Sequence, residues 1–425
     1  MTKTLVVLAN GARVGEVRQD KTGKLLFIYD ESWRRASGAY PLSLSMPLAA
    51  SEHPHSRIEP FIWGLLPDND AVLQKWAKKF QVSARSAFGL ISAVGEDCAG
   101  AVQFVAPDRI DAVTGDETAA IAWLSEAEIA ERLKMLKADH SAWRAMGDTG
   151  QFSLAGAQPK TALHFANGIW GVPSGRIPTT HILKPPTGEF DGHTENEHFC
   201  LSLAREIGLP TASSRVARFG DELAIVIERY DRIASGNRII RVHQEDMCQA
   251  LSVHPADKYE KDGGPTPLKI IDLLRETSGR ASDDVATFIK ALAFNWAIVG
   301  TDAHAKNYSV LIGAGGKSRL APIYDVASYI PYDDSQLYKV KLAMKIGGEY
   351  KVRDIGARQW GKFADAIGMA EDAVRGEATE IVSQLTDAID RVANQMRSDE
   401  LHHPIIQKLV GALAERLERC RRILN

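Results

Sequence analysis

Short apolar runs alternate with polar breaks at the start of the chain. Residues 4–9, 12–17 and 25–30 are rich in β-forming side chains, and Asn10-Gly11 separates the first two runs. Asn-Gly between apolar runs is a strong hairpin signal, because a two-residue turn of this kind needs positive φ at both positions. The pattern predicts a small antiparallel sheet at the beginning of the chain.

Further along the chain, strand and helix patterns are mixed. Residues 87–105 have a β-like pattern, whereas residues 124–147 are charged with helical spacing and lead into the glycine- and serine-bearing segment 150–158. The same periodicities predict helices at 70–80 and 195–207 and strands at 160–165, 180–184, 213–218 and 223–228.

After Tyr230-Asp231-Arg232 the pattern becomes helical. Apolar residues recur at helical spacing in residues 268–275, 284–299, 371–396 and 404–424. We therefore predict an α+β protein with a β-rich N-terminal part and a helical C-terminal part. Such an organisation would suit a phosphate site between two lobes.

Composition narrows the class of protein and its compartment. The 425 residues carry a net charge of −3, with 45% hydrophobic and 25% charged residues, as expected for a soluble globular protein of two or three structural units. This charge balance argues against a surface that binds nucleic acid on its own.

The four cysteines form no C-x-x-C pair, which indicates a reducing compartment. The N-terminus does not resemble a signal peptide, and no stretch approaches the ~20 apolar residues that span a bilayer, so we expect a cytoplasmic protein without membrane contact.

The strongest candidate site follows the apolar helix predicted at 284–299. Gly300 comes next, a usual C-terminal stop, and the polar loop 301–307 (TDAHAKN) follows at once. Two β-like runs, with a glycine turn between them, then lead to Asp325.

Phosphoryl transfer accounts for this order of residues. The reaction needs a carboxylate that orients and deprotonates the attacking hydroxyl, and oxygen ligands for Mg²⁺ at the phosphates. Protein kinases place the base and an amide ligand five residues apart, as Asp302 and Asn307 are, and a hairpin then delivers a second metal ligand, here Asp325. The spacing alone is weak evidence, because Asp191 and Asn196 share it without a following hairpin.

Two more side chains of the loop are candidates for function. His304 has no second histidine or nearby cysteine that would argue for zinc, so we interpret it as a loop organiser or a nucleotide contact. Lys306 can neutralise phosphate charge, or it is a solvent-facing lysine. The alternative for the whole loop is a solvated polar turn between a helix and a hairpin.

The parts that would hold a nucleotide come earlier in the sequence. Lys184 ends a predicted strand and is the candidate cation for the triphosphate, with Glu195 or Glu197 in the next helix as a possible partner. Residues 153–160 are rich in small side chains that let backbone N–H groups approach a phosphate, although they match no standard phosphate-loop pattern. Residues 227–232 are either the connection that binds adenine or an ordinary charged linker.

Taken in order, these segments resemble the HipA family of bacterial toxin kinases, the toxin half of a type II toxin–antitoxin pair. The resemblance covers nearly the whole chain, including the N-terminal sheet. The matching stretches are 153–163 (SLAGAQPKTAL), 178–184 (PTTHILK), 227–231 (IERYD), 244–249 (QEDMCQ), 258–265 (KYEKDGGP), 301–309 (TDAHAKNYS) and 322–328 (PIYDVAS).

The resemblance implies a two-lobed protein-kinase-like fold of the PI3/4-kinase-like type, with a β-rich N-terminal lobe and an all-helical C-terminal lobe. It divides the chain into a HipA N-terminal β-rich subdomain (1–110), a kinase N-lobe with phosphate loop and hinge (111–230), and a helical C-lobe with catalytic loop and metal site (231–425).

The resemblance also implies residue roles, with ATP and Mg²⁺ as cofactors. Asp302 is the catalytic base, Asn307 and Asp325 hold Mg²⁺, and Lys184 contacts the phosphates. Ser153 matches an autophosphorylated serine whose modification expels the loop and switches the kinase off. The implied nucleotide contacts are the phosphate-covering loop Ala155, Gly156, Ala157, Gln158, Pro159 and Lys160, the adenine segment Glu228, Arg229 and Tyr230, the pocket residue Gln244, and His304, Ala305, Lys306 and Asn307.

The implied substrate is a protein hydroxyl, on an aminoacyl-tRNA synthetase, and the implied outcome is stalled translation, growth arrest and persistence. The implied partner is a HipB-like helix-turn-helix antitoxin, with operator DNA reached only through that complex. The basic residues Lys351, Arg353, Arg358 and Lys362 fall near the region that approaches DNA in the family. Pro159 stands where the best-known members carry an acidic residue, and Pro185 directly follows the lysine, which puts loop mobility in doubt.

Two other functions would use the same residues. A small-molecule or lipid phosphotransferase shares the Asp, Asn and Asp core, so phosphate on Ser153 would favour the protein kinase and rapid turnover of a metabolite would favour this alternative. A DNA-regulatory protein with an inactive kinase fold is a third possibility, against which the intact catalytic set argues.

Overall fold

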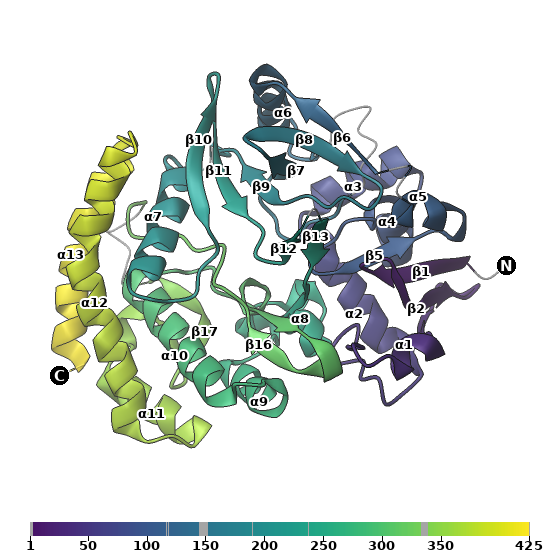
Figure 1. Cartoon of the computed structure of the whole chain (residues 1–425). Helices are drawn as coiled ribbons and strands as arrows, with labels where there is room; N and C mark the ends of the chain where they lie inside the picture. Colours follow the sequence, from purple (N-terminus) through teal and green to yellow (C-terminus); the bar gives the residue numbers. More distant parts are fainter. Residues whose placement is uncertain are drawn as a thin grey trace. The chain divides into compact units, whose positions relative to one another are not determined.

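The computed structural model describes residues 3–115, 117, 119–143, 152–188, 190–236, 238–332 and 339–424. The chain forms two compact units, each assembled from separate stretches of sequence (Figure 1). The first unit comprises Met1–Thr187, Ala217–Ala256 and Val310–Ser318, and the second comprises Gly188–Val216, Asp257–Ser309 and Arg319–Asn425. The three-part division at 110 and 230 stays a prediction.

The first unit begins with an antiparallel sheet in the order β4-β3-β2-β1-β5. Asn10 and Gly11 have φ of 48° and 84°, so the predicted two-residue hairpin is confirmed. Leu5, Val17 and Phe27 lie opposite one another across three strands and are buried, a kind of contact that stabilises sheets. The strands are β1 (Lys3–Ala9), β2 (Ala12–Gln19), β3 (Leu25–Tyr29), β4 (Glu52–Pro54) and β5 (Val102–Val105).

Five α-helices, counted over the residues that the structure describes, follow in this part of the first unit, and a sixth, α6, belongs to the second sheet described below. They are α1 (Glu31–Arg35), α2 (His55–Leu65), α3 (Asp70–Phe80), α4 (Ala87–Val94), α5 (Ile110–Thr114) and α6 (Glu126–Ala138). The predicted helix at 70–80 is confirmed as α3, and Asn69 caps it by accepting hydrogen bonds from the N–H groups of Ala71 and Val72.

Two predictions in this region need correction. Residues 87–94 form a helix, α4, and only β5 is a strand, because a short run that is apolar on every side looks the same in a buried helix and a buried strand. The helix predicted at 124–147 begins at Glu126 and ends at Ala138, since Asp139 leaves the helical conformation. Residues 144–147, together with 150 and 151 of the predicted segment 150–158, lie outside the described residues.

A second antiparallel sheet of the first unit has the order β10-β11-β9-β7-β8-β6, with Ala217 to Phe219 of β10 in this unit. Its strands are β6 (Ala120–Leu124), β7 (Thr161–Ala166), β8 (Ile169–Ser174), β9 (His181–Lys184), β10 (Ser214–Phe219) and β11 (Glu222–Glu228). The four predicted strands are therefore confirmed, and β6 and β8 are additions. Ile129 and Leu133 of α6 are buried in one apolar cluster with Leu163 and Val226 of the sheet.

The rest of the first unit is also β-rich. It contains β12 (Arg232–Ser235), β13 (Arg238–Arg241), β14 (His243–Asp246), the short helix α8 (Met247–Ala250) and most of the hairpin β15 (Ser309–Ile312) and β16 (Ser318–Leu320). The chain after residue 231 is therefore not all helical. The hairpin β15 and β16 was predicted as the two β-like runs before Asp325 and is confirmed. The pattern missed β12 to β14, because strands of four residues are too short to change the periodicity of an 11-residue window.

The second unit is mainly helical. The five helices predicted in it are confirmed, and α12 lies against α7, α10, α11 and α13 (Figure 1). The strands β17 (Lys341–Ile346) and β18 (Glu349–Lys351) form a hairpin here, which is a further departure from an all-helical lobe. Among the described residues, no helix has the length and apolar character of a membrane span. The helices are α7 (His193–Glu206), α9 (Pro267–Thr277), α10 (Ala281–Ile298), α11 (Ala357–Ile367), α12 (Glu371–Ser398) and α13 (Pro404–Leu424).

A buried charge cluster joins separate parts of the first unit. Asp97, in the loop before β5, lies 2.9 Å from Arg232, 3.2 Å from Arg241 and 3.5 Å from Arg229. Asp231 adds ion pairs at 2.9 Å with Arg229 and Arg232, and all five side chains are buried. Burial alone raises the pKa of a carboxyl group, but the three guanidinium groups hold the pKa of Asp97 well below its ordinary value.

Asp97→Asn should lower the free energy of unfolding by about 3–5 kcal/mol, because the removal of one partner leaves buried guanidinium charge uncompensated. Urea denaturation followed by tryptophan fluorescence measures the change. The matched control is Asp108→Asn, since Asp108 is exposed in the same region; it should shift stability by less than about 0.5 kcal/mol. Equal stability of the two variants would contradict the role of the cluster.

Glu245 on β14 is a buried acid in the same unit. The Leu44 N–H donates to Glu245 Oε1 at 2.7 Å. Burial raises the pKa of Glu245 to about 8, and neighbouring Asp246 adds to the rise, while hydrogen bonds from Leu44 and Ser43 oppose it.

Glu245→Gln should therefore gain stability relative to the wild type as the pH rises. The folded-state pKa of Glu245 lies above its ordinary value of 4.5. The protonated side chain therefore contributes to the free energy of unfolding in full below about pH 4.5, and this contribution is lost as the pH rises through about 8. Glutamine stays neutral throughout this range. Unfolding free energies of both proteins at about pH 5, 7 and 9 test the trend, and a difference that moves the other way would refute it.

Candidate active site

The loop that carries Asp302 follows α10 in the second unit. The left-handed residue that ends α10 is Val299, with φ of 57°, and not the predicted stop Gly300. Gly300 is needed for a different reason, because a Cβ atom there would lie 2.3 Å from Asn295 Oδ1. The Asn295 side chain is buried and donates to Ala291 O and Tyr308 Oη, so it cannot easily move away.

Backbone geometry brings the base and the amide ligand of the prediction together. Asn307 Nδ2 donates to the Asp302 carbonyl oxygen at 2.7 Å, and the His304 N–H donates to the same oxygen at 2.8 Å. Because the amide nitrogen makes this hydrogen bond, the amide oxygen Oδ1 is the Asn307 atom that can bind a metal ion. Oxygen is the type of ligand that Mg²⁺ prefers. The Asp302 side chain is 66% exposed, as a base that must meet an incoming hydroxyl should be.

A cavity of about 280 Å³ in the second unit is lined by Asp302, Asp325 and Glu197. Asp325 has φ of 57°, a left-handed conformation that is uncommon outside glycine and that occurs often at functional sites. The other lining residues are Phe190, His193, Asn295, Gly300, Thr301, Ala303, Val326, Ala327, Ser328, Tyr329 and Tyr332.

The donor set fits Mg²⁺. Asn307 and Asp325 offer an amide and a carboxylate oxygen, and Mg²⁺ commonly takes one or two protein ligands while it keeps water and phosphate oxygens. Within the described ranges, no three His, Cys, Asp or Glu side chains gather into a metal-binding cluster.

Tyr324 and Asn196 fix the segment around Asp325. Tyr324 Oη donates to the Lys306 carbonyl oxygen at 2.7 Å and so connects this segment to the loop. Asn196, one half of the Asp191 and Asn196 pair that shares the kinase spacing, binds the Ser328 backbone through its amide nitrogen at 2.8 Å and its oxygen at 3.0 Å. Lys306 is buried, so its interpretation as a solvent-facing lysine is wrong.

The first unit holds the segment that was predicted to cover phosphates. Ser153 is fully buried; its Oγ donates to Leu65 O at the end of α2 at 2.7 Å, and its N–H donates to Asp97 O at 2.9 Å. The Asp68 N–H donates to Gly156 O at 3.1 Å. These bonds dock the segment 153–156 on the end of α2.

The remainder of this segment is compact as well. Lys160 Nζ donates to Ala155 O at 2.6 Å and lies 5.4 Å from the centre of the Trp143 ring. Gly156 has φ of 101°, and a Cβ atom there would lie 2.5 Å from Lys160 Nζ. Ala157 is exposed, Gln158 is half-buried and Pro159 is buried.

The other predicted nucleotide contacts also belong to the first unit. Lys184 is buried at the end of β9 opposite Ile225, and the Tyr230 hydroxyl donates to Gln244 Oε1. Glu228 is exposed at the end of β11. The Arg229 N–H donates to Thr180 O at 2.9 Å, and its side chain belongs to the charge cluster. Glu195 and Glu197 lie in the second unit, so their pairing with Lys184 stays a prediction.

Tyr259 is a contact of the loop for which spacing gave no indication. Its hydroxyl donates to Asp302 Oδ1 at 2.6 Å. The only signal in the sequence was its place in the motif KYEKDGGP.

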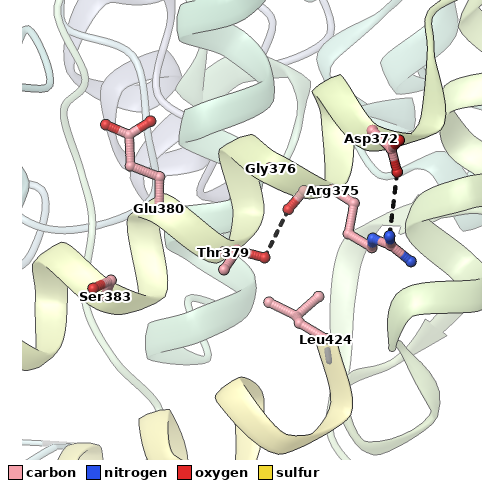
Figure 2. A pocket seen from close by; sticks show the side chains of 7 residues that line it. All are labelled: Asp372, Arg375, Gly376, Thr379, Glu380, Ser383 and Leu424. Carbon is pink, nitrogen blue, oxygen red and sulfur yellow. Dashed lines mark hydrogen bonds and ion pairs between the residues drawn. The ribbon is translucent and has the colours of Figure 1, made fainter.

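A second hollow, of about 630 Å³, lies along α12 beside Leu424 (Figure 2). Its polar side chains bind one another: Arg375 Nη2 lies 3.2 Å from Asp372 Oδ1, and Thr379 Oγ1 donates to Arg375 O. None of the predicted site residues lines it.

An acid–amide–acid set beyond a helix, together with a β-rich unit that carries a strand-end lysine, is typical of kinase-like proteins. The chain belongs to the HipA family. The family model for the HipA-like C-terminal domain matches residues 152–392, and the model for the HipA N-terminal domain matches residues 5–105.

Relatives resemble the chain along most of its length. A protein named putative kinase Y4mE, from Sinorhizobium fredii, is 36% identical over 92% of both chains. The serine/threonine-protein kinase toxin HipA of Shewanella oneidensis is 28% identical over 92% of this chain and 89% of its own. A solved structure of the HipA, HipB and operator DNA complex of that organism's toxin–antitoxin system matches with a TM-score of 0.84 at 25% identity, over 99% of this chain and 98% of the other.

Ser153→Asp should release the docked segment from α2. A carboxylate at this position would lose the bond to the Leu65 carbonyl oxygen and would place an unpaired charge in the interior. We expect the amides at positions 153 and 68, which donate to Asp97 O and Gly156 O, to exchange hydrogen about tenfold faster or more. Ser153→Ala, which adds no charge, is the control with a smaller expected effect. Unchanged exchange in Ser153→Asp would contradict the docking.

Proposed function

We propose that this protein is an ATP-dependent serine/threonine-protein kinase and the toxin of a type II toxin–antitoxin pair. The observation that carries the proposal is the arrangement in the second unit: Asp302 and Asp325 line one cavity, and Asn307 is bonded to the Asp302 backbone. Membership of the HipA family, with a relative named as a serine/threonine-protein kinase toxin, supports the reaction class.

The proposed chemistry assigns one task to each side chain. The Asp302 carboxylate orients the substrate hydroxyl and accepts its proton as the oxygen attacks the γ-phosphorus. The bond between the γ-phosphorus and the bridging oxygen of ATP breaks in the same step, and ADP leaves with that oxygen. Asn307 and Asp325 would hold Mg²⁺, which when bound neutralises charge on the phosphate oxygens. His304, Ala305 and Lys306 of the same loop are buried and would complete the nucleotide site, where Lys306 would neutralise phosphate charge.

The first unit supplies the proposed nucleotide contacts. Lys184 binds phosphate oxygens, and the backbone of residues 155–160 covers them. Residues 228–230 and Gln244 hold the adenine. Phosphorylation of Ser153 would break its bond to Leu65 and expel the segment, which would switch the kinase off.

The proposed partner is a HipB-like antitoxin with a helix-turn-helix, and operator DNA is reached through that complex. The match to a solved complex of HipA, HipB and operator DNA supports this partner. Lys351, Arg353, Arg358 and Lys362 remain candidates for the DNA-facing side, although Arg353 also pairs with Asp354 at 3.2 Å. The proposed substrate is a cytoplasmic aminoacyl-tRNA synthetase, whose modification would stall translation and arrest growth.

Asp302→Asn and Asp325→Asn should each lower phosphate transfer from radiolabelled ATP to lysate proteins by about 10²-fold or more, because each removes a group that acts in the transition state. Asp191→Asn is the matched control. Asp191 shares the sequence spacing of Asp302, but its side chain is 96% exposed and pairs with His403 at 3.4 Å, so this variant should keep full activity.

Phosphoproteomics of cells that express the wild type or Asp302→Asn identifies the substrate in the same experiment. Full activity of either core variant would refute the mechanism. Label found on a metabolite and on no protein would favour the small-molecule phosphotransferase, and ATP binding without any transfer would favour an inactive kinase fold.

A further inference from the structure

We propose that Tyr259 is the positioning residue of Asp302, an inference that rests on the proposed role of Asp302 as the base. The Tyr259 hydroxyl donates to Asp302 Oδ1 at 2.6 Å, the length of a strong hydrogen bond to a charged carboxylate. His304 Nε2 lies 3.8 Å from the same oxygen, which is beyond hydrogen-bond distance. Of these two side chains, the tyrosine is therefore the one that bonds this oxygen directly.

The phenol ring of Tyr259 is itself held in place. The His304 ring packs edge-on against it, with 4.9 Å between the ring centres. Lys261 Nζ lies 5.4 Å and Lys258 Nζ 5.8 Å from the ring centre, within the range of cation–π attraction. The Lys258 carbonyl oxygen accepts a bond from the Ala305 N–H at 3.3 Å, which joins the tyrosine segment to the catalytic loop by the backbone as well.

Asp302 needs such a support because of where it lies. Its side chain is 66% exposed, so packing does little to restrict its two torsion angles. A base works only when its oxygen is within hydrogen-bond reach of the reacting hydroxyl, and small displacements cost large factors in rate. With Oδ1 bonded to Tyr259, the carboxylate is held in one orientation, and Oδ2 can accept the substrate proton.

Tyr259→Phe removes only the hydroxyl. Rates of transfer from radiolabelled ATP to lysate proteins, measured against ATP concentration, should show a maximal rate lowered about 10- to 100-fold with KM for ATP unchanged. A merely structural role would disturb the loop that contains His304 and Asn307 and would raise KM as well. Tyr350→Phe is the control, because it removes a tyrosine hydroxyl from the same unit; its rate should equal that of the wild type.

The double variant Tyr259→Phe with Asp302→Asn tests whether the Tyr259 hydroxyl affects the transfer rate through Asp302 or independently of it. It should be no slower than Asp302→Asn alone, because the hydroxyl acts through the carboxylate. A further loss in the double variant, an unchanged rate in Tyr259→Phe, or a raised rate that marks the hydroxyl as a block on the base would each overturn the proposal. Phosphate found on Tyr259 by mass spectrometry would overturn it too, since the residue would then be an acceptor.

A crystallographic comparison keeps this inference distinct from the proposed function. If the wild type transfers no phosphate, the proposed function fails, and crystal structures of the wild type and Tyr259→Phe still decide whether Tyr259 positions Asp302. We expect one Asp302 orientation in the wild type and a changed or mixed orientation in the variant. The same single orientation in both proteins would overturn the positioning role.

Discussion

The carboxylate of Asp97 is the contact on which the first unit depends. Its side chain compensates three buried arginines and accepts from both the N–H and the hydroxyl of Thr179, two residues before β9. Its backbone oxygen accepts the Ser153 N–H. One residue therefore connects the N-terminal sheet, the strand that ends in Lys184 and the segment that carries Ser153. Because unpaired buried charge is costly, these parts keep their arrangement together.

In the second unit, the loop after α10 is organised around one backbone oxygen. A single carbonyl oxygen, that of Asp302, accepts from Asn307 and from the His304 N–H, so the proposed base and the proposed metal ligand share one turn. The carboxylate of Asp302 stays exposed, while residues 304–307 of the loop are buried. This division is useful for catalysis, since the rigid part of the loop sets distances and the exposed part meets the substrate.

Periodicity predicted the long elements of the fold, and it failed where a run is short or lacks a distinct polar side. The helices near 284–299 and 371–396 have clear apolar stripes and were predicted within a few residues. Residues 87–94 have Ser92 as their one polar residue, and β12 to β14 have four residues each, so neither showed a clear period. The spacing of Asp302 and Asn307 predicted a shared turn, but Tyr259 lies 43 residues away in sequence, and no local pattern reports such a contact.

The docking of Ser153 also bears on whether the chain can be divided. The two family models cover residues 5–105 and 152–392, as if these were separable modules. Yet the last carbonyl of α2 and the Asp68 N–H, both in the first module, hold Ser153 and Gly156, which lie in the second. The border between the modules is therefore an internal protein–protein interface. A replacement of the N-terminal module would therefore have to present the same carbonyl and N–H groups to the segment that begins at Ser153.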